Sequence, residues 1–180
     1  LIFAARGRTL REGAPFELMS RAAGIVANNL VLTVILGIVF IGTLYPLIAE
    51  ALTGEKLSVG APYFNAVAGP LAILLGILLA VGPLLSWRQE NRPVLRKVAL
   101  PALFSATVLA IAFIAWPQAG LLSKLGLALA AGLIPASILP LVGRNPFRAP
   151  LSTWGMAIAH LGAAVAVAGM ASDRAFTIEK

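Results

Sequence analysis

The chain has 180 residues; 59% of them are hydrophobic, only 12% are charged, and the formal net charge is +7. A soluble domain usually carries about 25% charged residues, so this chain cannot cover a water-facing surface, and lipid must replace the missing polar groups. Cysteine is absent from the sequence, which excludes disulfides, thiolate chemistry and cysteine metal sites. The basic residues lie between long apolar runs and not along one face, so the charge indicates membrane topology and no binding to nucleic acid.

Five stretches without a charged residue follow one another along the chain, and each is long enough for one membrane crossing but not for two. A helix needs about 20 apolar residues to cross a hydrocarbon core of about 30 Å. In lipid the backbone hydrogen bonds must close within each segment, so the crossings are helices. The sequence therefore predicts an all-α fold, a polytopic transmembrane helical bundle of about five spans, near residues 25–48, 67–86, 98–116, 122–142 and 152–171.

The connections between these spans contain turn-forming residues. Residues 117–120, with a proline and a glycine at their ends, are expected to form a tight turn between the third and fourth spans. Residues 57–65 include Gly60 and Pro62, and we expect them to form an outer loop in which Tyr63 lies at the membrane interface. Asn28 and Asn29, at the start of the first span, are expected to cap that helix or to bond a neighbouring one.

Basic residues divide unequally between the two sets of connections. Cytoplasmic loops are enriched in lysine and arginine, so the richer set is expected in the cytoplasm, with the N-terminus there and the C-terminus outside. The poorer set holds Lys56, Lys124, Arg174 and Lys180. The richer set holds Arg6, Arg8, Arg11, Arg21, Arg88, Arg92, Arg96, Lys97, Arg144 and Arg148.

None of the acidic residues falls inside a predicted span, which disfavours ion-coupled transport by this stretch. The chain begins with leucine, and residues 1–5 are typical of the tail of an earlier helix. We therefore expect residues 1–180 to form a single membrane domain that is a fragment of a longer chain.

His160 is the only histidine of the sequence and lies about nine residues into the fifth predicted span. At 1.5 Å per residue its depth is roughly 14 Å, near the bilayer midplane. An ionisable side chain at this depth is costly and needs a partner. Two interpretations are open. In one, a neutral imidazole bonds a carbonyl or hydroxyl group of a neighbouring helix and ties the bundle together. In the other, it ligates a metal, with haem iron as the first candidate.

Small residues surround His160 on the predicted helix. Gly155, Gly162 and Gly169 repeat every seven residues and are expected to form a stripe for close helix packing, which a Gly162→Leu substitution would weaken. His160 points away from this stripe, because two residues turn a helix by about 200°. Its own face is expected to leave room for a flat ligand, and carries Ala157, Ala163, Ala164 and Val167.

Several segments resemble the C-terminal half of CcmF, the cytochrome c-type biogenesis protein of the haem lyase complex. The resemblance extends over about 140 residues, and one departure is Ala22, where relatives usually have glutamate after Ser-Arg. The matching segments are Asn28-Asn29-Leu30, Gly42-Thr43-Leu44-Tyr45-Pro46, Val59-Gly60-Ala61-Pro62-Tyr63-Phe64-Asn65, Gly155-Met156 and Ala159-His160-Leu161-Gly162.

The resemblance implies a multi-pass protein of the bacterial cell inner membrane that binds haem and assists its covalent attachment to apocytochrome c at the outer face. In the family, the histidine of the Ala-His-Leu-Gly segment is an axial iron ligand of a haem b held within the membrane, and this role corresponds to His160. Implied partners are haem, apocytochrome c, quinol, the lipid bilayer and the other cytochrome c maturation subunits, including the haem chaperone.

The chain lacks the tryptophan-rich outer segment of the family and a second histidine, so the second axial ligand is expected outside it. No catalytic residue is assigned, since the resemblance implies a part of a haem lyase (cytochrome c synthase) without a complete catalytic site. The alternatives are a transporter or permease fragment and a structural membrane scaffold without a cofactor.

Overall fold

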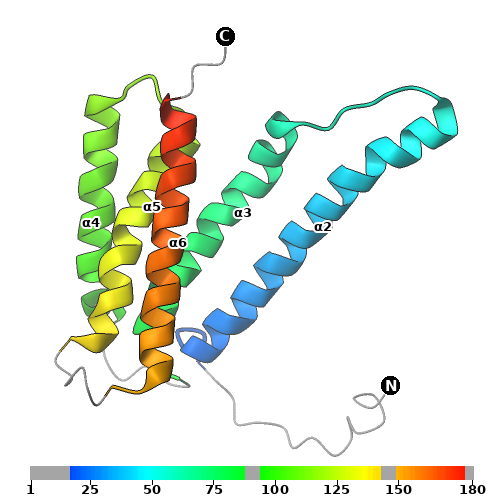
Figure 1. Ribbon diagram of the computed structural model, residues 1–180. Coiled ribbons are helices and arrows are strands. Elements are labelled where there is room, and N and C mark those ends of the chain that lie inside the picture. Colours follow the sequence, from blue (N-terminus) through cyan, green and yellow to red (C-terminus); the bar gives the residue numbers. More distant parts are fainter. Residues whose placement is uncertain (1–16, 88–93, 143–148, 177–180) are drawn as a thin grey trace, which may run out of the picture.

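Five helices that are long and apolar enough to cross a membrane make up the computed structural model, which describes residues 17–87, 94–142 and 149–176 (Figure 1). The predicted all-α fold with five spans is confirmed. The helices are α2 (Arg21–Thr53), α3 (Ala61–Val81), α4 (Val94–Ala115), α5 (Leu121–Ile138) and α6 (Leu151–Phe176). Short 3₁₀ turns, η2 (Gly82–Leu84) and η3 (Leu139–Leu141), end α3 and α5.

Helix α2 is longer at both ends than the predicted span, because its ends are set by caps and not by charges. Ser20 is the N-cap: its hydroxyl accepts a hydrogen bond from the Ala23 amide at 3.2 Å and donates to the Glu17 carbonyl at 2.6 Å. At the other end, Gly54 has φ +73 and donates its N–H to the Glu50 carbonyl. A left-handed residue in this position favours glycine. Asn28 and Asn29 lie two turns inside this helix, so the prediction that they cap it is wrong.

Helix α3 begins at Ala61, so the prediction of an outer loop over residues 57–65 is wrong for its second half. Pro62 lies in the first turn of α3, where the missing N–H costs nothing and the fixed φ favours the helix. The chain between α2 and α3 is therefore confined to residues 54–60. The turn predicted over residues 117–120 between the third and fourth spans is confirmed.

Helix α5 is the central element and packs against α3, α4 and α6. Ten of its residues are buried, whereas no other helix has more than three buried side chains described. Small residues allow the close approach: a Cβ on Gly126 would lie 2.9 Å from that of Ala171 in α6. On the α3 side the glycines belong to α3, where Gly69 and Gly76 face the side chains of Leu122 and Leu129.

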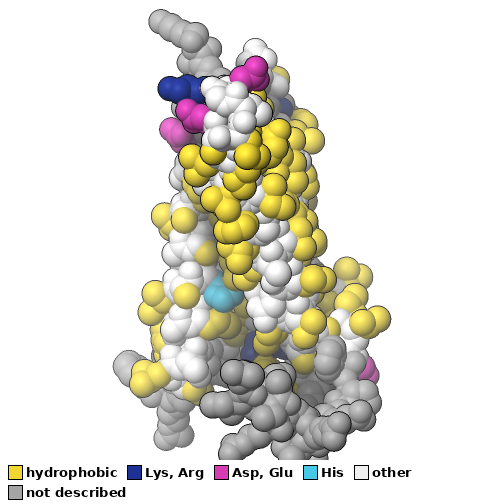
Figure 2. Space-filling model, turned by 90° about the vertical axis from the view of Figure 1, so that its right-hand side faces the viewer, with side chains coloured by type: hydrophobic (Ala, Val, Ile, Leu, Met, Phe, Trp, Pro, Cys, Tyr) yellow, Lys and Arg dark blue, Asp and Glu magenta, His cyan; other side chains and the backbone are white. Residues whose placement is uncertain are grey.

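The outer sides of the bundle are apolar and suited to lipid. Figure 2 shows hydrophobic side chains along the height of the bundle, with most of the acidic side chains in view at its upper end. Large side chains such as Leu36, Ile114 and Val165 are 67%, 83% and 73% exposed. In water such exposure would be unfavourable, so the described chain is a multi-pass membrane protein.

Helix α6 packs through its alanines and not through its glycines, so the predicted glycine packing stripe is wrong for the described part of the chain. Ala157, Ala164 and Ala171 also repeat every seven residues, and they are 2%, 2% and 6% exposed. A Cβ added at Gly155, Gly162 or Gly169, the glycines of the predicted stripe, meets no atom within 4 Å. The heptad spacing thus produces two rows of small residues on one helix, and the small side chains of α5 receive the alanine row.

Three of the basic residues on which the orientation was predicted lie together at one end of the bundle: Arg21 begins α2, while Arg96 and Lys97 lie in the first turn of α4. We call this end the basic end. Lys56 and Lys124 lie in the loop before α3 and in the first turn of α5, which is the alternation the prediction requires. The cytoplasmic placement of the basic end stays a prediction. The other basic residues counted lie outside the described residues, as does the side chain of Arg174: Arg6, Arg8, Arg11, Arg88, Arg92, Arg144, Arg148 and Lys180.

The first testable consequence concerns the contact between α4 and α5 at Gly132. A Cβ there would collide with the Ser105 hydroxyl and lie 3.0 Å from the Pro101 carbonyl oxygen. We expect Gly132→Val to lower the free energy of unfolding by about 1–3 kcal/mol, since overpacking of a close contact forces backbone shifts. Thermal unfolding of the chain in detergent, followed by circular dichroism, measures this. Gly162→Val is the matched control with the same change in helix propensity, and an equal loss in both variants would contradict the packing described here.

The second consequence concerns the contact between α2 and α3 at Gly42. A Cβ there would lie 2.9 Å from the ring of Tyr63 and 3.0 Å from that of Phe64, two rings that already pack edge to face. We expect Gly42→Val to loosen the far end of α2 from α3, and Tyr63→Ala to restore part of the loss in the double variant. The distance between spin labels placed on α2 and α3, measured by electron paramagnetic resonance, reports the separation of the two helices. Gly37→Val is the control because its added Cβ meets nothing within 4 Å; if it separates the helices as much, the Gly42 contact is not the cause.

Candidate functional site

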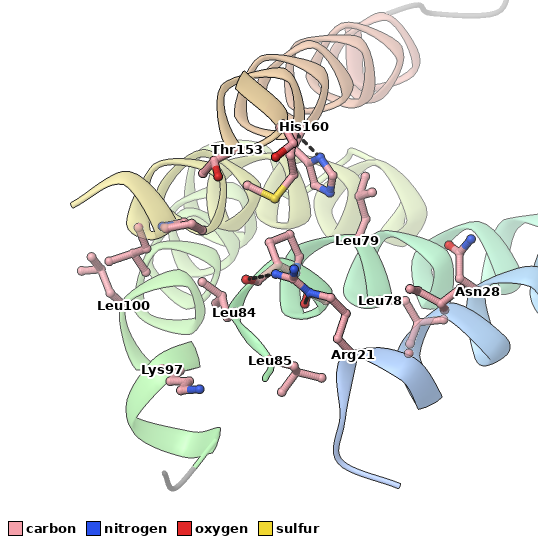
Figure 3. A pocket seen from close by; sticks show the side chains of 18 of the residues that line it. Arg21, Asn28, Leu78, Leu79, Leu84, Leu85, Lys97, Leu100, Thr153 and His160 are labelled. Atoms are coloured by element: carbon pink, nitrogen blue, oxygen red, sulfur yellow. Dashed lines mark hydrogen bonds between the residues drawn. The ribbon is translucent and has the colours of Figure 1, made fainter. Parts of the chain in front are cut away.

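A cavity of about 900 Å³ lies at the basic end of the bundle, between the starts of α2, α4 and α6 and the ends of α3 and α5. Ligand pockets in proteins usually measure about 300–1,000 Å³, so this cavity can hold a large organic molecule. Leucines, prolines and Ile25 supply its apolar walls, while a few polar side chains face it from different helices (Figure 3). The polar lining residues are Arg21, Asn28, Arg96, Lys97, Ser152, Thr153 and His160.

His160 reaches this cavity from α6, and its ring has a defined orientation. Its Nδ1 lies 2.8 Å from the carbonyl oxygen of Met156, one turn earlier on the same helix (Figure 3). A carbonyl can only accept, so Nδ1 carries the hydrogen and donates it. In the neutral imidazole the lone pair then lies on Nε2, and no group among the described residues bonds this nitrogen. The imidazole is therefore oriented as in metal sites, where the second ring nitrogen donates to a carbonyl.

The bond to Met156 bears on the two interpretations of His160 that its position left open. In the purely structural one, the imidazole ties two helices together, but the carbonyl found here belongs to its own helix. His160 is partly buried and appears as the cyan side chain in the flank of the bundle, nearer the lower end (Figure 2). Within the described part of the chain the imidazole is thus not a link between helices.

The room beside His160 lies on a different side from the one expected. Ala157 and Ala164 were expected to leave space for a flat ligand, yet both are buried against α5, so that expectation is wrong for them. The cavity extends instead along the row formed by His160, Met156 and Thr153, which recur every three or four residues on α6. Ala163 and Val167 do not line it.

Arg21 forms the opposite wall and joins α2 to the end of α3. Its Nε donates to the Gly82 carbonyl at 3.3 Å and one terminal nitrogen donates to the Pro83 carbonyl at 2.7 Å. The backbone amides of Arg21 and Ala22 donate to the carbonyls of Ser86 and Trp87 at 2.8 and 3.1 Å. Carbonyls at a helix end lack partners within the helix, so Arg21 both caps α3 and fixes the start of α2. Sequence reasoning gave this arginine a topological role only.

Three further lining residues were missed as site residues. Arg96 and Lys97 come from the first turn of α4, and Lys97 donates to the Ser86 hydroxyl at 3.3 Å. Asn28 faces the cavity from the second turn of α2. The signal that could have found Asn28 is the spacing of seven residues from Arg21, which places both side chains on one side of a helix.

Ligands for a metal ion are few in this cavity. Met156 has a thioether, but it lies four residues from His160 on the same helix, so the two side chains approach from one side and cannot be opposite axial ligands. Among the described residues, no group of three or more histidine, cysteine, aspartate or glutamate side chains could hold a metal. Within the described lining, His160 is the one imidazole that could offer a nitrogen to a metal or cofactor.

The opposite end of the bundle holds a smaller, apolar cavity of about 640 Å³, lined by Asn65 and Pro70 of α3 and by leucines of α5. Tyr63 and Phe64 do not line it, because they pack on Gly42. Lys124, nearby in the first turn of α5, is 5% exposed; it donates to the Pro117 carbonyl at 3.1 Å and lies 4.5 Å above the ring centre of Phe113. Through these contacts Lys124 stabilises the turn between α4 and α5.

The chain is similar to curated cytochrome c-type biogenesis proteins. It is 34% identical to CycK of Bradyrhizobium diazoefficiens over 99% of the chain and 29% of that relative. It is 32% identical to CcmF of Escherichia coli over 100% of the chain and 28% of the relative, and 36% identical to ccl1 of Rhodobacter capsulatus over 94% and 27%. No family model matches the chain, and no solved structure matches it significantly.

These matches cover nearly the whole chain but only a little over a quarter of each relative. The similarity therefore extends through all five helices, including both sides of the cavity at the basic end. By sequence the chain is of the CcmF/CycK type and corresponds to the C-terminal part of these cytochrome c-type biogenesis proteins.

Proposed function

We propose that this chain works in cytochrome c maturation and that its cavity at the basic end holds a haem b with His160 as one axial ligand of the iron. The observation that carries the proposal is the orientation of the imidazole: Nδ1 is fixed by the Met156 carbonyl, and the lone pair of Nε2 is left for a ligand. Neutral imidazole is a common axial ligand of haem iron.

The cavity suits a large, flat and mostly apolar molecule. Its volume of about 900 Å³ lies at the upper end of the usual range for ligand sites, and Leu78, Leu79 and Leu100 from α3 and α4 provide apolar surface (Figure 3). His160 supplies one nitrogen ligand, so a second axial ligand would come from outside this chain. When bound, a haem b supplies one-electron transfer at a potential set by its axial ligands and surroundings.

The relatives are named for cytochrome c-type biogenesis, and the finer role proposed here follows that of the family. The intact protein would lie in the bacterial inner membrane and assist the covalent attachment of haem to apocytochrome c at the outer face. It would act with the other maturation subunits, including the haem chaperone, and with quinol as an electron source. The described residues would contribute the haem b ligand and its pocket to that assembly.

The test is a His160→Ala substitution in the intact protein purified from its membrane. We expect the b-type absorption bands to be lost while the protein still assembles, because the alanine removes the iron ligand without filling the cavity. Imidazole added to the purified variant should restore part of the absorption, since it can occupy the space that the side chain left. Haem content by pyridine haemochrome and the thermal unfolding midpoint are measured together.

Ile158→Ala is the matched control, since Ile158 lies on the same helix, is 64% exposed and does not line the cavity. Unchanged haem content in His160→Ala would remove the ligand role. Equal loss of haem in both alanine variants, without rescue by imidazole, would show that the helix and not the ring nitrogen is what matters.

A further inference from the structure

The positive charge of Arg21 is not neutralised by any described group. Its side chain is partly buried, and two of its nitrogens are used by the carbonyls of Gly82 and Pro83. The remaining guanidinium N–H groups have no partner among the described residues, and the cavity is the space they adjoin. A guanidinium has five N–H donors in a planar fork, so Arg21 can still hold an anion while it caps α3.

A second unpaired cation lies at the same cavity. Arg96, in the first turn of α4, is exposed and makes no hydrogen bond or ion pair with the residues described. The described part of the cavity lining contains no aspartate or glutamate. Two guanidinium groups therefore line one cavity whose described lining has no acidic residue, and their positive charge would favour an anionic ligand there. The need for pairing is greater for Arg21, which is partly buried, than for the exposed Arg96.

The arrangement of the polar groups is two-sided. In Figure 3, His160 enters from α6 and Arg21 from α2, and both side chains point into the space between them. A ligand that fills this space would meet a neutral nitrogen lone pair on one side and a cation on the other. Haem has this division, with iron at the ring centre and two carboxylates on one edge of the ring.

We propose that Arg21 and Arg96 bind the carboxylates of the haem that His160 ligates, so that the acidic edge of the ring points to the basic end of the bundle. The inference rests on the proposed haem site and adds the orientation of the ring within it. Arginine suits this role, because its fork can form two parallel hydrogen bonds with one carboxylate. Arg21 would act as a positioning residue that also shapes the pocket, whereas Arg96 would contribute binding alone.

The experiment compares iron protoporphyrin IX with its dimethyl ester, in which both carboxylates are blocked. The intact protein is stripped of haem and reconstituted with each compound, and binding is followed by the b-type absorption. We expect the free acid to bind about tenfold more tightly than the ester, as charge-assisted hydrogen bonds require. Arg96→Gln should remove much of that preference while leaving the ester affinity unchanged, and Arg21→Gln should do the same if it folds.

Lys56→Gln is the matched control: it removes the same charge at the opposite end of the bundle, and Lys56 does not line the cavity. Equal affinity for acid and ester in the unmodified protein would overturn the inference. So would a preference that survives Arg96→Gln, or one that Lys56→Gln lowers as much as Arg96→Gln does. The unmodified protein separates the two proposals: failure of both compounds to give b-type absorption contradicts the haem site itself, whereas equal binding of acid and ester contradicts only the arginine contacts. A preference for the acid that persists in His160→Ala with altered absorption supports the arginine contacts independently of the iron ligand.

Discussion

The hydrogen bonds between the start of α2 and the end of α3 are the interaction on which the cavity depends. Helix α2 packs chiefly on α3 and η2, so little else in the described chain holds its first turn in place. At this point Arg21 donates side-chain and backbone hydrogen bonds to the segment from Gly82 to Ser86. Helix-end carbonyls near lipid must find donors, and one arginine satisfies them while fixing a wall of the pocket. Without these hydrogen bonds, α2 would not be held in place as the wall of the cavity opposite His160.

The other wall owes its position to small residues. Ala157 and Ala164 bring α6 onto α5, and this close packing sets the rotation of α6 about its axis. The rotation carries Met156 and His160 to the rim of the contact, where the ring can bond its own helix and still face open space. Larger residues in the alanine row would push α6 outward and turn the imidazole with it. The orientation of the imidazole is therefore a consequence of helix packing and not of the histidine alone.

The number and type of elements could be predicted from the sequence, because charge-free stretches of sufficient length have few alternatives in lipid. The ends of α2 and α3 could not, since Ser20, Gly54 and Pro62 determine them through local hydrogen bonds and fixed dihedral angles that a hydropathy pattern does not register. The faces of α6 could not either. Two heptad rows of small residues are equivalent in sequence, and only the surface of α5 distinguishes the alanines from the glycines.

His160 was identified from its isolation in an apolar stretch, a signal that depth and cost make strong. Arg21 and Arg96 were assigned to topology for an equally good physical reason, since most arginines beside membrane spans set orientation. A topological charge and a ligand-binding charge differ only in what lies across from them in three dimensions. Sequence reasoning could not place α2 and α4 at one cavity, and so it could not separate the two roles.

The position of the cavity also bears on which haem it could serve. The cavity lies at the basic end, which the distribution of arginine and lysine predicts to be cytoplasmic, whereas attachment to apocytochrome c is proposed at the outer face. From His160 to the end of α6 at Phe176 are 16 residues, or about 24 Å along the helix. With that orientation, a haem bound to His160 would lie too far from the outer face for its covalent attachment there. On the proposed function, the pocket would hold a resident haem, and the haem to be attached would need a separate binding surface near the other end of the helices.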